Sequence, residues 1–213
     1  MLDRISAAAA GHRLAVMGGF HPGPEDGAPA GTRTLLLLGP MEPGHWDHLS
    51  AQPEMRDGRP DPVDRWSRRV IGRMACDLGG KAVFPFTGPP YHPFQRWAQA
   101  TGRAWQSPVR LLVHDTAGLM VAFRGALALR DHLDLPATGP KPCDTCARPC
   151  LTACPAGALT GAGYDVPACH DWLDRTGQEC LSAGCLVRRA CPLSQSYGRV
   201  SEQSAYHMRQ FHT

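Results

Sequence analysis

The sequence predicts an α+β fold in two parts, a sheet-and-helix domain followed by a small cysteine-rich module. Short apolar runs that end at glycine or proline indicate several strands, and one longer stretch has the periodicity of an amphipathic helix. The 20 prolines and 23 glycines imply many turns and argue against a helical bundle. Eight of the nine cysteines lie between residues 143 and 191. We therefore expect three segments: 1–136, 137–195 and a tail, 196–213.

The strands of the N-terminal domain are predicted from three apolar runs. Residues 13–18 are apolar and are followed by a second glycine and a loop rich in glycine and proline. Residues 34–38 contain four consecutive leucines and are closed by Gly39-Pro40. Residues 81–86 form a third run. Each is too short for a helix and is bounded by residues that break regular structure, so each is expected to be a buried strand.

The strongest helix prediction begins at Asp61-Pro62. Asp61 is a suitable N-cap, and Pro62 suits the first helical position, where no backbone N–H partner is needed. The glycines at 79 and 80 end the helix. Cys76, the ninth cysteine, lies in this helix and is expected to be a small packed residue. One apolar stripe repeats at intervals of three and four residues: Val63, Trp66, Val70, Met74 and Leu78.

The chain continues with shorter elements. Residues 93–101 predict a short helix ending at glycine. Residues 109–114 and 119–124 predict two strands joined by the turn 115–118, which is an antiparallel hairpin. After the cysteines, a polar tail contains a further predicted helix at 202–211.

The cysteines begin with the spacing C-x2-C-x3-C-x3-C-P, from Cys143 to Pro155. Bacterial ferredoxins with two clusters use C-x2-C-x2-C-x3-C-P, in which the fourth cysteine ligates the other cluster. A second Cys-Pro step follows at Cys191-Pro192. Eight thiolates and two such steps are what two [4Fe-4S] clusters require. The crossover rule predicts two ligand sets: Cys143, Cys146, Cys150 and Cys191 for one cluster, and Cys154, Cys169, Cys180 and Cys185 for the other.

Other readings of the cysteines remain open. Eight thiolates are also enough for two structural zinc ions, although zinc sites usually show two well-separated short pairs. Clusters or zinc ions of purely structural use would make the protein an interaction module. A disulfide framework requires an oxidising compartment. The N-terminal apolar stretch carries an early Asp3 and is interrupted at Gly11, so we expect no export signal and a cytoplasmic protein.

Charge and motif content exclude several function classes. The formal net charge of +3 is small for a dedicated nucleic-acid binder, and the arginines of the helix after Pro62 are expected to face solvent. No apolar run is long enough to span a membrane. No glycine-rich phosphate loop is present either, because the glycines at 79 and 80 are a helix stop.

The order of motifs resembles the catalytic core of epoxyqueuosine reductases, relatives of cobalamin-dependent reductive dehalogenases. The similar pieces include Leu111–Val121, the linker Leu133–Pro136, and Cys154-Pro-Ala-Gly-Ala-Leu159. The run Val83–Pro89 resembles the strand of that family that ends in D-[ST]-[AG]-P. The resemblance implies a nitroreductase-like N-terminal domain that holds a corrinoid, and a ferredoxin-like module whose two clusters reduce the cobalt.

That resemblance also suggests where a corrinoid would lie. The expected pocket is bounded by the hairpin 109–124, the turn Phe84–Pro90 and the cysteine module. Phe86 stands where the family has its presumed proton donor, so no catalytic residue is assigned. The candidate cofactor-binding residues are Phe84, Phe86, His21, His92 and His114.

Two functions follow from these observations. The first is an iron–sulfur electron-transfer protein with two [4Fe-4S] clusters, which exchanges electrons with a redox partner protein. The alternative is an oxidoreductase, in which the clusters reduce a bound cobalamin or, less in keeping with the motifs, a flavin. An acidic side chain near the cofactor pocket would favour the reductase. Because Phe86 stands at that position, electron transfer is the preferred prediction.

Overall fold

The computed structural model describes residues 1–212 and has an α+β fold with small antiparallel sheets and several helices, as the sequence predicts. The chain divides into two compact units. The first contains residues 1–103 and 122–139, and the second contains residues 104–121 with the chain from residue 140 onward. Within residues 1–212, no helix is both long and apolar enough to cross a membrane.

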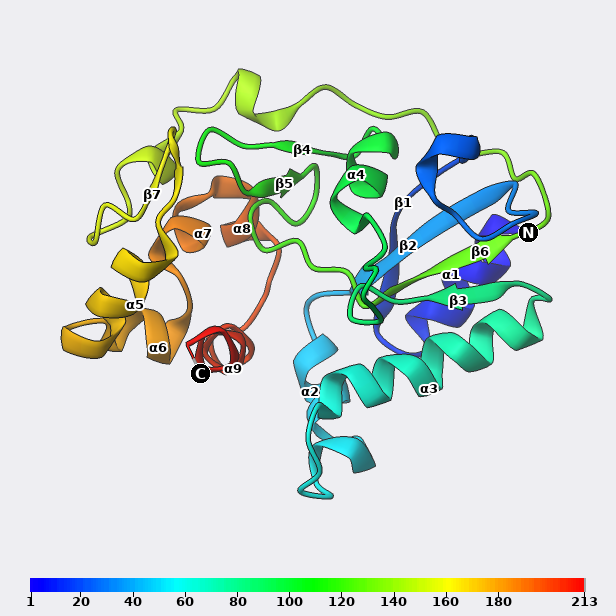
Figure 1. Cartoon of the computed structure of the whole chain (residues 1–213), viewed down its shortest axis with the longest axis horizontal. Helices are drawn as coiled ribbons and strands as arrows, with labels where there is room; N and C mark the ends of the chain where they lie inside the picture. Colours follow the sequence, from blue (N-terminus) through cyan, green and yellow to red (C-terminus); the bar gives the residue numbers. More distant parts are fainter. Residues whose placement is uncertain (213) are drawn as a thin grey trace. The chain divides into compact units, whose positions relative to one another are not determined.

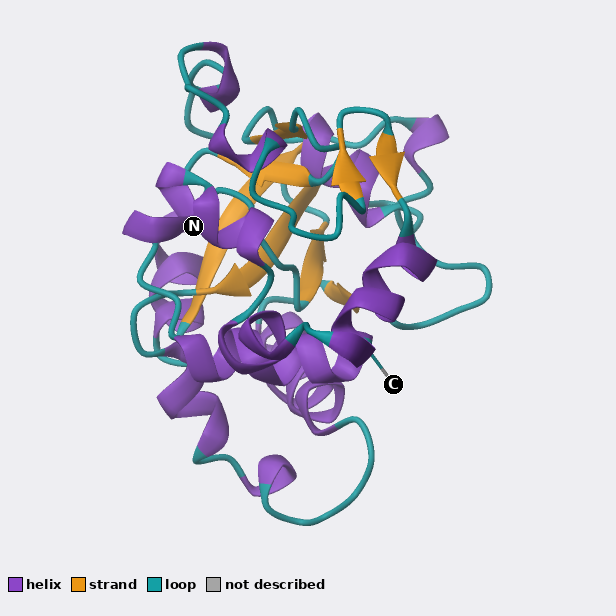
Figure 2. Ribbon diagram, turned by 90° about the vertical axis from the view of Figure 1, so that its left-hand side faces the viewer, coloured by secondary structure: helices purple, strands orange, loops and turns teal. Residues whose placement is uncertain are grey.

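The first unit is built on a four-stranded sheet in the order β1-β2-β6-β3, with every neighbouring pair antiparallel. Figure 2 shows its strands as orange arrows with purple helices beside them. Its strands are β1 (Leu14–Phe20), β2 (Thr34–Pro40), β3 (Lys81–Val83) and β6 (Gly125–Leu129). Its helices are α1 (Leu2–Ala10), α2 (His45–Ser50), α3 (Pro62–Asp77) and α4 (Phe94–Ala100).

The leucine run explains why β2 lies inside this sheet. All seven residues of β2 are buried, because the strand has a neighbour on each side and side chains pack on both of its faces. The long helix α3 lies along β3 and β6 (Figure 1). Its predicted stripe is buried at Val63, Trp66, Val70 and Met74, and is partly buried at Leu78. Gly79 follows with a φ of +65°, which is the left-handed conformation that ends the helix.

The second unit consists of short elements. It has two small hairpins: β4 (Ala104–Gln106) with β5 (Leu112–His114), and β7 (Leu159–Thr160) with β8 (Gly163–Tyr164). The cysteines lie among single 3₁₀ turns and short helices. These helices are α5 (Val166–Arg175), α6 (Gln178–Ala183), α7 (Leu186–Ala190), α8 (Pro192–Ser196) and α9 (Ser201–Phe211).

The predicted hairpin of residues 109–114 and 119–124 is wrong. β5 pairs instead with β4, and residues 119–124 form no strand. The reason lies in the backbone hydrogen bonds of Leu119 and Met120. The Leu119 N–H donates to Ser194 Oγ (2.9 Å), and the Leu119 and Met120 carbonyls accept from the side chains of Arg188 (2.6 Å) and Arg199 (3.2 Å). Because side chains already satisfy these groups, no partner strand is needed.

Two other expectations differ from the structure. The run 81–86 is a strand only as far as Val83. Asp61 precedes α3, but its side chain makes no capping hydrogen bond, since its backbone is left-handed (φ +52°).

The units also differ from the segments 1–136, 137–195 and 196–213. The second unit takes in residues 104–121, whose backbone is bonded to the cysteine-rich part as just described. It also includes α9 from the tail, which packs on α6 and buries Gln203, Ser204 and Ala205.

Candidate functional site

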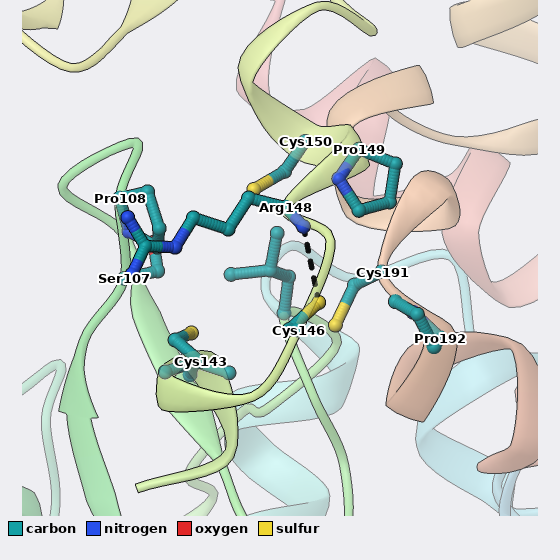
Figure 3. Close-up of a pocket in the computed structure, with 11 residues that line it drawn as sticks. Ser107, Pro108, Cys143, Cys146, Arg148, Pro149, Cys150, Cys191 and Pro192 are labelled. Atoms are coloured by element: carbon teal, nitrogen blue, oxygen red, sulfur yellow. Dashed lines mark hydrogen bonds between the residues drawn. The ribbon is translucent and has the colours of Figure 1, made fainter.

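Four cysteines from distant parts of the second unit line one hollow: Cys143, Cys146, Cys150 and Cys191. Two 3₁₀ turns, Pro142–Asp144 and Pro149–Leu151, carry Cys143 and Cys150, and Cys191 immediately precedes α8. Figure 3 shows the sulfurs of these side chains around the space, with the β4–β5 hairpin on the opposite side. The prolines at 142, 149 and 192 each begin a helical turn directly beside a cysteine, which suits a residue without an N–H.

Cys191 is held in position by the turn that follows β5. Gly118 lies so close that a Cβ atom at this position would be 2.9 Å from Cys191 Sγ and 2.5 Å from the Ser194 nitrogen. Its φ of +56° also favours glycine. The turn itself is closed by two hydrogen bonds of 3.0 Å between His114 and Gly118. Cys191, from the end of the module, therefore packs closely against this turn.

The sulfurs of this first set have polar and electrostatic neighbours. The backbone N–H of Arg148 donates to Cys146 Sγ at 3.3 Å (Figure 3). Burial raises the pKa of the Cys143 thiol, and the neighbouring thiols of Cys146, Cys150 and Cys191 raise it further. Burial and Cys191 likewise raise the pKa of Cys150. The four thiols are therefore close enough for their charges to interact.

The other four cysteines of the module form a second set. Burial raises the pKa of the Cys180 thiol, and the nearby thiols of Cys185, Cys169 and Cys154 raise it further. Burial also raises the pKa of Cys169, again with contributions from Cys185 and Cys154. The helices α5 and α6 carry Cys169 and Cys180, and Cys185 precedes α7. Cys154, Cys169, Cys180 and Cys185 are therefore close enough for their charges to interact, and their assignment to one cluster stays a prediction.

Tyr164, on β8, adds a hydrogen-bond donor to the second set. Its hydroxyl lies near the Cys169 thiol, and their interaction lowers the pKa of Cys169 in part. Burial, followed by this interaction, raises the pKa of Tyr164 far above its ordinary value. The tyrosine is also stacked on Phe211 of α9, with ring centroids 6.0 Å apart.

The cysteines are part of the apolar core of the second unit. Cys150 is 6% exposed and belongs to its buried centre, and Cys143, Cys154, Cys185 and Cys191 pack against that centre. The other members of the buried centre are Val109, Val113, Leu119, Leu159 and Val187. An apolar shell of this kind limits water around the sulfurs.

Zinc and iron–sulfur clusters require different spacings of the sulfurs. Among residues 1–212, no three or more His, Cys, Asp or Glu side chains converge as closely as a single metal ion requires. A tetrahedral zinc ion with Zn–S bonds of about 2.3 Å would hold its sulfurs about 3.8 Å apart. In an iron–sulfur cubane each thiolate binds a different iron, so the thiolates stay farther apart.

Four of the five candidate cofactor-binding residues lie in the first unit, where each has neighbours of its own. His21 Nε2 is 3.0 Å from the Leu133 carbonyl oxygen, and its ring is stacked on His132 at 3.8 Å. Phe84 and Phe86 are half-buried and stacked on each other at 5.3 Å.

The Arg68 guanidinium lies over the ring of Phe86, with its Cζ 5.1 Å from the ring centroid. His92 packs against Trp97 at 5.4 Å. A pocket at the end of the sheet, lined by Lys81 and Arg130 among others, contains none of the four.

The fifth candidate, His114, belongs to the second unit and is 1% exposed. Its Nδ1 lies 3.1 Å from the Thr116 nitrogen and 3.3 Å from the Ala117 nitrogen, so Nδ1 accepts from the two backbone N–H groups. Asp115 lies 3.0 Å from the same nitrogen. His114 therefore shapes the turn that contacts Cys191.

Some residues have a place that the sequence analysis did not anticipate. Ser107 and Arg148 line the hollow of the first set, and Tyr164 lies near a cysteine of the second. No local pattern marks them, because their roles depend on tertiary contacts. Cys76, expected to be packed, is exposed on α3.

Comparison of the chain with family models, curated proteins and solved structures finds no match.

Proposed function

We propose that this chain is an iron–sulfur electron-transfer protein that carries two [4Fe-4S] clusters. Cys143, Cys146, Cys150 and Cys191 would hold one cluster, and Cys154, Cys169, Cys180 and Cys185 the other. The observation that carries the proposal is the hollow that Cys143, Cys146 and Cys150 line together with the distant Cys191, while the other four cysteines lie near one another.

A cluster fits the first set better than a single zinc ion does. The four cysteines line one hollow, which leaves room between their side chains. Ser107 is one of the lining residues, and its buried Oγ has no hydrogen-bond partner among residues 1–212, so an added group would satisfy this donor. Inorganic sulfide and thiolate sulfur both accept such hydrogen bonds.

The proposed activity is the acceptance and release of single electrons, which the clusters supply when bound. The thiolates hold the irons, the apolar core around Cys150 restricts water, and the donors from Arg148 and Tyr164 contribute to the reduction potentials. A redox partner protein and a reducing compartment such as the cytoplasm belong to the same proposal, because thiolate ligands must stay reduced.

The proposal predicts about eight irons and eight sulfides per chain in protein purified without oxygen. A brown protein whose broad visible absorption bleaches on reduction is expected, together with the electron paramagnetic resonance signals of reduced [4Fe-4S] clusters. Stoichiometric zinc without iron would contradict the proposal.

The alternative, a nitroreductase-like reductase with a bound corrinoid or flavin, rests on the order of motifs. The candidate residues give it little support, since Phe86 is packed between Phe84 and Arg68 and His21 is engaged with Leu133 and His132. Titration of the iron-loaded protein with hydroxocobalamin separates the two functions. Stoichiometric binding with a shifted cobalamin spectrum would favour the reductase, whereas an unchanged spectrum at excess cobalamin favours a ferredoxin-like carrier.

A further inference from the structure

Ser107 is held rigidly beside the first set of cysteines. It follows β4 and begins the loop of the β4–β5 hairpin, where its N–H donates to the Leu111 carbonyl (2.8 Å) and its own carbonyl accepts from Arg110 (3.0 Å). Arg110 adopts a left-handed conformation (φ +65°) that closes this loop. Both backbone groups of Ser107 are thereby satisfied, and its position does not depend on its side chain.

The side chain of Ser107, unlike its backbone, has no hydrogen bond within residues 1–212. The residue is 5% exposed, and its Oγ is buried without a hydrogen-bond partner in the described part of the chain, residues 1–212. A buried hydroxyl without a partner is unfavourable and is rare in folded proteins. Ser107 nevertheless lines the hollow together with the cysteines (Figure 3), and Pro108 next to it has no N–H to offer. A group that occupies the hollow would supply the missing acceptor.

We propose that the Ser107 hydroxyl donates a hydrogen bond to a sulfur of the cluster held by Cys143, Cys146, Cys150 and Cys191, and that it raises the reduction potential of this cluster. The inference rests on the proposed function and adds a specific residue to it. Reduction adds negative charge to the cluster, and a donor aimed at sulfur stabilises that charge. The second cluster has a different donor, Tyr164, which is 37% exposed. Ser107 therefore helps to make the two clusters unequal.

Replacement of Ser107 by alanine tests this directly. Ser107→Ala removes the hydroxyl, and the potential of one of the two clusters should decrease while that of the other is unchanged. Ser107→Thr keeps the hydroxyl and should keep a potential nearer to that of the wild type. Ser182→Ala is the matched control, because Ser182 is an exposed serine of the same unit whose hydroxyl bonds to the Glu179 carbonyl. It should change neither potential.

The measurement is a potentiometric titration of anaerobic protein followed by electron paramagnetic resonance, with iron and sulfide determined on each sample. Ser107→Gly, which removes the hydroxyl without adding atoms, is a second variant in case the alanine protein assembles poorly, and it should show the same decrease. Unchanged potentials in alanine or glycine variants that hold eight irons would overturn the role of Ser107 and leave the clusters established. Wild-type protein without iron would instead overturn the proposed function.

Discussion

The two units of this chain are stabilised in different ways. The first has a sheet with a fully buried central strand, β2, in which Leu35 to Leu38 are each 0% exposed. The second has strands of only two or three residues, and cysteine side chains form much of the wall of its small core. Since a fully buried leucine contributes about 1.5–3 kcal/mol, the four leucines of β2 stabilise the first unit, whereas the smaller buried centre of the second unit includes Cys150 and is packed against other cysteines. The second unit is therefore expected to depend on bound metal for its fold.

Removal of the iron should have the largest effect. Chelation or oxidation of the proposed clusters is expected to unfold residues 140–194 and to leave the sheet of the first unit folded, because only the former segment contains the proposed ligands. Hydrogen exchange measured by mass spectrometry should show loss of protection in 140–194 and retained protection in β1 and β2. Equal protection of 140–194 with and without iron would refute this dependence.

A cavity in the first unit should have the converse effect. Leu36→Ala in β2 removes a side chain that is 0% exposed and should destabilise the first unit by about 3 kcal/mol, while about eight irons remain bound. Denaturant unfolding and iron content of the same samples provide the check. Cys76→Ser is the control, since Cys76 is exposed on α3, and it should alter neither quantity. Loss of iron in Leu36→Ala at low denaturant would show that the units do not fold separately.

A smaller expected effect is the loss of stability of the first unit at acidic pH. Hydrogen bonds from Arg69 hold the pKa of the Glu54 carboxyl below its ordinary value, although burial alone would raise it. The stabilisation is therefore complete above the unfolded glutamate pKa of about 4.3 and is lost as the pH falls through the lowered value in the folded protein. Because Arg69 is half exposed, the contribution is at most about 1 kcal/mol.

Glu54→Gln should remove this pH dependence from the unfolding of the first unit and leave the iron content unchanged. Asp77→Asn is the matched control, because Asp77 pairs with Arg73 on the exposed surface of α3. An identical stability profile between pH 3 and pH 6 for Glu54→Gln and the wild type would show that the Arg69 contact contributes nothing.

The success of the sequence predictions follows the range of the contacts involved. The strand at the four leucines and the helix after Pro62 were predicted, because each depends on its own pattern of apolar residues. The helix in the polar tail near the C-terminus was predicted as well. The hairpin of residues 109–124 was wrong, since Ser194, Arg188 and Arg199 bond to the backbone of Leu119 and Met120 from about 70 to 80 residues away. No local pattern shows such bonds.

In the candidate site, too, local sequence patterns were predictable and long-range contacts were not. The grouping of the cysteines follows from the spacing and the crossover rule, and their binding of clusters stays a prediction. The contact of Gly118 with Cys191 and the unpartnered hydroxyl of Ser107 exist only in the folded chain. The corrinoid pocket, inferred from resemblance, also stays a prediction.

Anomalous X-ray scattering at the iron edge, from crystals of protein prepared without oxygen, tests the central claim most directly. The account predicts two separate iron centres in each chain, one bonded to Cys143, Cys146, Cys150 and Cys191 and the other to Cys154, Cys169, Cys180 and Cys185. A zinc signal in place of iron, or a single metal centre shared by Cys143 and Cys154, would contradict it.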